Sequence, residues 1–106
     1  METIEEAERV LEKYPDKIPI IVNISNKCKE LSPLEKKKYI VPSDMTVGQF
    51  IYIVRKKIKL SPGQALYFYC NNTIQPNSST LKSVYEKNRN ENKFLYIYYS
   101  TESTFG

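Results

Sequence analysis

The sequence has 106 residues, of which 41% are hydrophobic and 26% charged, with a formal net charge of +4; these values are typical of one soluble globular domain. It holds no histidine, which excludes serine–histidine and cysteine–histidine nucleophile pairs and histidine-ligated zinc. Its three glycines, Gly48, Gly63 and Gly106, are too far apart to form a phosphate-binding loop. Most familiar chemistries of small enzymes are therefore excluded.

The charge is distributed unevenly along the chain. Residues 1–12 carry five glutamates and one arginine, a net charge of −4, whereas residues 35–59 carry seven basic residues and two acids, a net charge of +5. A basic face of this kind attracts nucleic acid, an anionic membrane or an acidic peptide, or is a solvated surface without a partner.

We expect a cytoplasmic protein with reduced thiols. No apolar run reaches the about 18 residues that a membrane span needs, and the acidic N-terminus does not have the pattern of a signal segment. Cys70 lies in an aromatic stretch and Cys28 in a polar one. We interpret Cys70 as a small buried hydrophobe and Cys28 as a loop residue, in preference to a disulfide or a catalytic thiol.

The first predicted element is an amphipathic helix. Residues 3–6, Thr-Ile-Glu-Glu, have the pattern of a capping box, in which the Thr3 hydroxyl accepts from the Glu6 amide and the Glu6 side chain reaches back. Apolar residues then recur on one helical face up to Tyr14, and Pro15 ends the helix.

A hairpin of two strands is predicted next. Residues 17–25 are rich in β-branched side chains and predict a strand, in which Pro19 lies at an edge or a bulge because it has no amide donor. A polar loop follows at 26–34. Residues 36–42, with the sequence Lys-Lys-Lys-Tyr-Ile-Val-Pro, predict a second strand that pairs with the first.

The main helix is predicted to begin at a second capping box, formed by Thr46 and Gln49. Its apolar positions keep the spacing of a stripe that faces a core. This stripe consists of Val47, Phe50, Ile51, Val54 and Ile58.

The C-terminal half predicts two further strands around a short helix. Residues 64–70 form the third strand, and turn residues follow it. The helix begins at Leu81, and residues 94–99 form the fourth strand. Residues 100–106 are polar and are expected to be a flexible tail.

This order of elements predicts an α+β fold of the ubiquitin-like β-grasp type, a four-stranded mixed sheet around a central helix with one extra N-terminal helix. We divide the chain into an N-terminal helical extension at 1–16, a ubiquitin-like domain at 17–99 and a C-terminal tail at 100–106. No repeat or linker interrupts it before the tail.

Five sequence blocks make a more specific identification possible. They occupy residues 14–22, 36–42, 44–50, 55–62 and 94–106, and they include Lys-Lys-Lys-Tyr-Ile-Val-Pro and the terminal Thr-Phe-Gly. In this order, and with nearly unbroken spacing, they closely resemble the autophagy-related protein eight family. That family includes the GABA-receptor-associated protein and light chain 3.

The resemblance implies a modifier that is itself a substrate, without catalytic residues or a cofactor. An activating enzyme would adenylate the Gly106 carboxylate and bind it as a thioester, and a conjugating enzyme would pass it to the amine of phosphatidylethanolamine. Phe105 would give the activating enzyme and a processing or deconjugating cysteine protease an apolar handle. The lipid-linked form would be anchored on autophagosomes, where it acts in their formation.

The resemblance also implies that cargo receptors and adaptors bind through short aromatic-x-x-aliphatic motifs. Such a peptide would add a strand beside Lys38–Val41 and place its two anchors in two apolar pockets. The first pocket would be lined by Glu6, Val10, Pro19, Ile20, Lys36, Lys38, Ile40 and Phe94. The second would be lined by Tyr39, Val41, Pro42, Met45, Phe50, Val54 and Lys57. For the apolar residues, above all Phe50 and Val54, ordinary core packing is the competing interpretation.

The chain departs from the family pattern at four points. The helix that usually precedes residues 3–14 is absent from this sequence, naturally or by truncation, which leaves the partner and membrane contacts of that helix open. Lys57 stands where arginine is usual and lacks its planar fork. The loop at 26–34 looks one residue longer, and the sequence ends at Gly106, either because the gene encodes an exposed glycine or because this is the processed form.

Two alternative functions remain open at this stage. A sibling modifier that is joined to a protein lysine also ends in glycine, although the Thr-Phe-Gly ending favours the lipid type. A basic RNA-binding domain would stack bases on Tyr67 and Tyr69. Packing within a sheet explains the alternating tyrosines more simply, so we expect no nucleic-acid partner.

Overall fold

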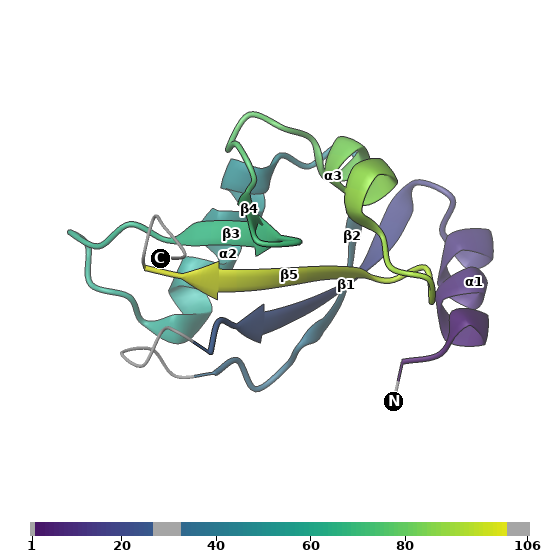
Figure 1. The fold of residues 1–106 in the computed structure, drawn as a ribbon, viewed down its shortest axis with the longest axis horizontal. Helices are drawn as coiled ribbons and strands as arrows, with labels where there is room; N and C mark the ends of the chain where they lie inside the picture. Colours follow the sequence, from purple (N-terminus) through teal and green to yellow (C-terminus); the bar gives the residue numbers. More distant parts are fainter. Residues whose placement is uncertain (1, 27–32, 102–106) are drawn as a thin grey trace.

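A computed structural model of the chain describes residues 2–26 and 33–101. Three helices and five strands make up this part of the chain (Figure 1). The helices are α1 (Ile4–Lys13), α2 (Val47–Ile58) and α3 (Leu81–Asn88). The strands are β1 (Lys17–Ile24), β2 (Lys38–Pro42), β3 (Tyr67–Cys70), β4 (Thr73–Ile74) and β5 (Leu95–Ser100). The predicted α+β class is confirmed, but the sheet has five strands and not four.

The strands form one mixed sheet in the order β2-β1-β5-β3-β4. β1 and β2 pair antiparallel, with Ile20 opposite Tyr39, as the predicted hairpin requires. β1 and β5 run parallel, and β3 pairs antiparallel with both β5 and β4. The first and last strands of the chain therefore lie side by side at the centre, and β2 lies at one end of the sheet.

The strand that the sequence did not predict is β4. It has only two residues, Thr73 and Ile74, which pair with Cys70 and Tyr69. Two residues are too few to show an alternating pattern. The preceding turn, Asn71-Asn72, was recognised by its chemistry; both residues have left-handed φ angles, of 52° and 64°.

Five strand boundaries differ from the predicted ones. β1 ends at Ile24 and not at residue 25, and β5 begins at Leu95 and not at residue 94. β3 begins at Tyr67 and not at residue 64, because Gln64 belongs to the turn before it: its amide donates to the Ser61 carbonyl at 3.1 Å, and its own carbonyl accepts from Arg55 Nη1 at 2.6 Å. β2 begins at Lys38 and not at residue 36. β5 includes Ser100, which is buried, so this residue belongs to the sheet and not to the predicted tail.

Pro19 is tolerated inside β1 because of where its missing donor would point. The Val22 amide donates to the Lys37 carbonyl on the β2 side of β1. Since amides alternate along a strand, the nitrogen of Pro19 faces the other side, toward β5. Pairing with β5 begins only one residue later, at Ile20 and Leu95, so no ladder bond is lost.

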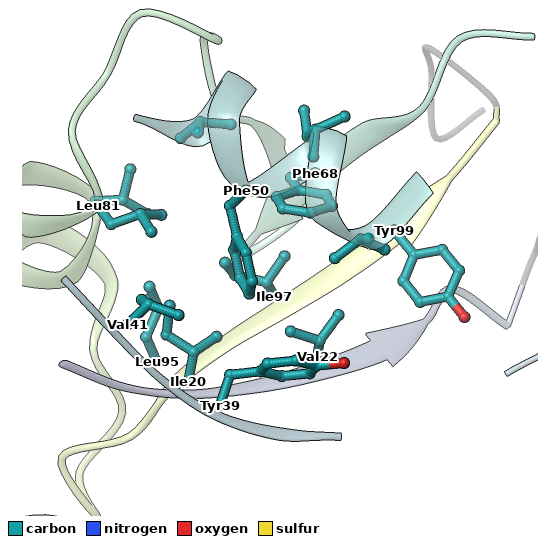
Figure 2. Packing of buried hydrophobic residues seen from close by; sticks show 14 of the residues in the cluster. Ile20, Val22, Tyr39, Val41, Phe50, Phe68, Leu81, Leu95, Ile97 and Tyr99 are labelled. Atoms are coloured by element: carbon teal, nitrogen blue, oxygen red, sulfur yellow. The ribbon is translucent and has the colours of Figure 1, made fainter. Parts of the chain in front are cut away.

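The main core lies between the sheet and α2. Phe50 is fully buried at its centre, and its ring contacts those of Tyr39 and Phe68 edge to face, each at 5.6 Å between centroids (Figure 2). All five predicted stripe residues of α2 are buried in this core.

A smaller cluster lies on the opposite face of the sheet, which we call the outer face. There Ala7 of α1 packs against Ile21 and Phe94, with Tyr96 beside them. Ala7 and Phe94 are fully buried. This cluster holds α1 against the sheet close to β2, and so positions the site described next.

Candidate functional site

β2 is an edge strand that combines an unpaired edge with an exposed apolar side chain. Among the described residues, only β1 pairs with it. Tyr39 and Val41 point into the core, with 7% and 6% of their surface exposed, whereas Ile40 points outward and is 42% exposed. The predicted position of residues 38–41 at a sheet edge is therefore present in the structure.

A hollow of about 710 Å³ lies between α1 and β2, beside Ile40. Three of the predicted first-pocket residues line it, namely Glu6, Val10 and Ile40. The rest of the lining comes from α1 and the residues that flank it, namely Thr3, Arg9, Glu12, Lys13 and Tyr14. Sequence reasoning missed these, although Arg9, Lys13 and Tyr14 follow Glu6 or Val10 by three or four residues and so are their neighbours on the surface of α1.

An ion pair joins the two walls of this hollow. The Lys38 ammonium donates to the Glu6 carboxylate and lies 3.9 Å from an oxygen of Glu2. The hydrogen bond from Lys38 lowers the pKa of Glu6, and the same bond raises the pKa of Lys38. In the predicted capping box Glu6 reaches back to Thr3. In the structure the Thr3 hydroxyl does accept from the Glu6 amide, at 3.2 Å, but the carboxylate accepts from Lys38.

The remaining predicted residues of the first pocket lie elsewhere. Pro19 is buried, and Phe94 is fully buried in the small cluster beneath α1. Ile20 is fully buried in the main core, on the face of the sheet opposite α1. Lys36 lies at a different hollow. The structure thus brings together half of the predicted set, the three lining residues and Lys38, and separates the rest.

The predicted second pocket is divided into two hollows along β2 and α2. One, of about 230 Å³, is lined by Lys36, Tyr39 and Lys57 together with Leu34 and Glu35. The other, of about 760 Å³, contains the predicted Pro42 and Met45. It also contains Asp44, Thr46, Gly48, Gln49, Tyr52 and Ile53. The predicted Val41, Phe50 and Val54 line neither hollow and are buried in the main core, as the packing interpretation requires. Figure 2 shows Val41 and Phe50 there.

Tyr39 forms part of the floor of the smaller hollow. Lys36 Nζ lies 5.1 Å from the centre of its ring, a cation–π contact that holds a positive charge over the aromatic face. The Tyr39 hydroxyl is buried, and among the described residues it has no hydrogen-bond partner. Burial raises the pKa of this hydroxyl, so it stays protonated at neutral pH.

Neither a metal site nor a membrane-spanning helix is found among the described residues. In the ranges 2–26 and 33–101, no three His, Cys, Asp or Glu side chains gather as a metal site. No helix in these ranges is both long and apolar enough to cross a bilayer. Cys28, Phe105 and Gly106 lie outside the described residues.

The candidate RNA surface is only partly accessible. Tyr69 is 3% exposed, and its neighbour two residues earlier, Tyr67, is half-buried. Tyr69 pairs with Tyr98 of β5 and with Ile74 of β4. A base stacks on an open ring face, so Tyr69 is not a platform for one.

Cys70 is expected to be unreactive in the native protein, because it is 1% exposed and burial raises the pKa of its thiol from 9.0 to about 12. Alkylation at about pH 8, read by mass spectrometry, should label Cys70 only after urea is added. Native labelling as fast as in urea would contradict this.

The same shift makes the stability depend on pH. Since the thiol of Cys70 ionises between pH 9.0 and about 12 only when the protein is unfolded, the contribution of Cys70 to the free energy of unfolding falls as the pH rises through that range.

The chain as a whole matches known proteins. A family model described as "Autophagy protein Atg8 ubiquitin like" matches residues 2–106. Autophagy-related protein 8A of Oryza sativa subsp. indica is 50% identical over 101 residues, which are 95% of this chain and 84% of the relative. Autophagy-related protein 8e of Arabidopsis thaliana is 52% identical over 101 residues, which are 95% and 82%.

A solved structure agrees with these sequence matches. The crystal structure of Trypanosoma brucei ATG8 is similar to this chain with a TM-score of 0.87 and 40% identity, covering 97% of this chain and 88% of that one. The mixed sheet around α2 therefore defines a ubiquitin-like protein. Within that class, the chain belongs to the Atg8 family of autophagy proteins.

Proposed function

We propose that this chain is a lipid-conjugated modifier of autophagy that recruits partners through short linear motifs. In this proposal it performs no catalysis. Its free form is cytoplasmic, and its conjugated form is anchored on autophagosomes through phosphatidylethanolamine. The observation that carries the recruiting function is the edge strand β2, with hollows beside it on the α1 and α2 sides.

An extended peptide would pair with β2 and place alternate side chains to either side of the strand. The main-chain groups of β2 supply its hydrogen bonds, and the hollows supply the selectivity. An aromatic anchor would enter the hollow beside Val10 and Ile40. An aliphatic anchor would contact the surface around Tyr39 and Pro42.

The charge around β2 favours peptides with acidic flanks. Lys36 and Lys57 line one hollow together, and Lys38 lies at the other, where Glu6 and Glu2 already neutralise it. An acidic residue of the peptide would exchange with these glutamates at Lys38. At the other hollow, an acidic residue of the peptide would meet Lys36 and Lys57. Glu35 is the one acidic residue among those that line this hollow, so it competes little with the peptide for the two lysines.

Conjugation would be performed by other proteins on the Gly106 carboxylate. An activating enzyme forms the acyl adenylate and then a thioester, a conjugating enzyme accepts the acyl group on its own cysteine, and the lipid amine displaces that thiol. A cysteine protease would process or release the modifier, with Phe105 as the residue it recognises beside the glycine. The match of the family model through residue 106 supports this assignment.

The peptide site is tested by Ile40→Arg. A long charged side chain in the middle of the β2 edge should lower the affinity for an aromatic-x-x-aliphatic peptide with acidic flanks by at least about tenfold in calorimetric titrations. Lys38→Glu should also lower the affinity, by repelling the acidic flank.

The matched control is Tyr98→Arg. Tyr98 is 41% exposed, nearly the same fraction as Ile40, but it lies on β5 and not at the β2 edge. Its substitution should leave the peptide affinity unchanged. Unchanged affinity in both Ile40→Arg and Lys38→Glu would place the peptide site elsewhere.

A further inference from the structure

A further hollow, of about 470 Å³, lies away from the β2 edge. It is formed where the C-terminal end of α3 and the β3–β4 turn meet β5, toward the end of the sheet opposite to β2. Four asparagines, two tyrosines, Lys87 and Arg89 line it. The described residues that form its wall include no aspartate or glutamate, so its charge is positive.

The wall of this hollow is held in place by internal hydrogen bonds. Asn71 is in the left-handed turn before β4, and its Nδ2 donates to Asn88 Oδ1 at 3.0 Å. Asn88 Nδ2 in turn donates to the Val84 carbonyl of α3, also at 3.0 Å. These two bonds tie the β3–β4 turn to the end of α3, so the hollow does not depend on a ligand for its shape.

At Asn90 and Tyr96 the side-chain oxygen already accepts a hydrogen bond, and a donor is left. The oxygen of Asn88 accepts from Asn71, and Oδ1 of Asn90 accepts from the Glu91 amide at 3.0 Å. The Tyr96 hydroxyl accepts from Asn92 Nδ2 at 2.9 Å, which leaves its proton to be donated. What these groups offer to a ligand is therefore the amide nitrogen of Asn90 and the Tyr96 proton.

Two positively charged side chains, Lys87 and Arg89, supply further hydrogen-bond donors to this hollow. Lys87 and Arg89 are both exposed, and within the described ranges neither of them forms an ion pair. The Arg89 guanidinium lies 5.8 Å from the centre of the Tyr85 ring, which limits its freedom. Hydrogen-bond donors and uncompensated positive charge select a ligand with several anionic oxygens, of which phosphate is the usual case.

The hollow also has an aromatic platform. Tyr98 lies two residues after Tyr96 on the same face of β5 and is 41% exposed. Tyr98 also lines a neighbouring hollow of about 310 Å³, and Asn72 likewise lines both this hollow and the one of about 470 Å³. An exposed ring of this kind stacks on a planar ligand group, as aromatic side chains do on nucleic-acid bases.

We propose that this hollow binds a small phosphorylated molecule with a planar ring, such as a nucleotide. Lys87 and Arg89 hold the phosphate, with the Tyr96 hydroxyl and the Asn90 amide as further donors, and the ring stacks on Tyr98. The site shares no residue with the β2 edge, so it is independent of peptide binding and of conjugation.

Titration of the 106-residue protein with AMP, followed by amide chemical shifts in NMR, tests the proposal. We expect saturable shifts around residues 71–72 and 87–98, with a Kd of about 1 mM or below at low salt. Adenosine and inorganic phosphate, each of which keeps only part of the contacts, should both bind at least about tenfold more weakly than AMP.

Variants separate a defined site from general attraction to a basic protein. The double substitution Lys87→Gln with Arg89→Gln should reduce AMP affinity at least about tenfold. Lys82→Gln, on the same helix but outside the hollow, removes one positive charge and should leave the affinity unchanged. No saturable shift, equal weakening by Lys82→Gln, or adenosine binding as tight as that of AMP would overturn the proposal.

Discussion

Replacing Phe50 by alanine is expected to lower the free energy of unfolding by about 3–5 kcal/mol. The side chain is fully buried between α2 and the sheet, and its ring makes edge-to-face contacts with Tyr39 and Phe68. Truncation removes both ring contacts and leaves a cavity that rigid neighbouring strands cannot fill. A domain of this size has a total stability of about 5–15 kcal/mol, so the loss is a large part of it.

Equilibrium unfolding in urea measures this effect, and Tyr52→Ala is its control. Tyr52 lies two residues later on α2 but is 61% exposed. Its ring makes a cation–π contact with Lys56, whose Nζ lies 4.3 Å from the ring centre. Its truncation should change the stability by less than about 1 kcal/mol. If Phe50→Ala were as mild as Tyr52→Ala, Phe50 would belong to an adaptable pocket wall and not to the core.

Elements with long, regular patterns could be predicted from sequence, and short ones could not. The second capping box is present in full, with Thr46 and Gln49 bonding reciprocally at 2.9 and 3.2 Å, so α2 was predicted almost to the residue. β4 has no pattern of its own, and it forms only because the left-handed turn at Asn71 and Asn72 returns the chain along β3. That pairing depends on tertiary contact and not on local propensity.

The candidate site was predicted less completely, for a geometric reason. Membership of a pocket depends on which way each strand residue points, and a shift of one residue reverses it. Ile20 faces the main core, whereas Ile21 faces α1, and the alternation within an all-apolar run is invisible in the sequence. The edge position of β2 rested on the family resemblance. The lysines at 36–38 agree with it, because charged side chains protect an exposed edge from pairing with other chains.

Gly106→Ala is expected to abolish conjugation to phosphatidylethanolamine. In the proposed function, each transfer requires the terminal carboxyl group to enter a narrow enzyme site and be attacked there, and glycine has no Cβ to obstruct this or to restrict its backbone. Reconstitution of the 106-residue chain with the activating enzyme, the conjugating enzyme and liposomes measures the outcome as a shift in gel mobility. The wild-type chain should form the lipid-linked species with liposomes that contain phosphatidylethanolamine, and not with phosphatidylcholine alone.

Gly63→Ala supplies the matched control for this experiment. A Cβ added at Gly63 meets no atom within 4 Å, and its φ is not positive, so the substitution disturbs neither packing nor backbone. Gly48 would be a poor control, since an added Cβ would lie 3.3 Å from Asn77. Gly63→Ala should be conjugated like wild type. A lipid-linked product from Gly106→Ala would show that the reaction does not require glycine at this position, and conjugation only to protein amines would favour a modifier of protein lysines.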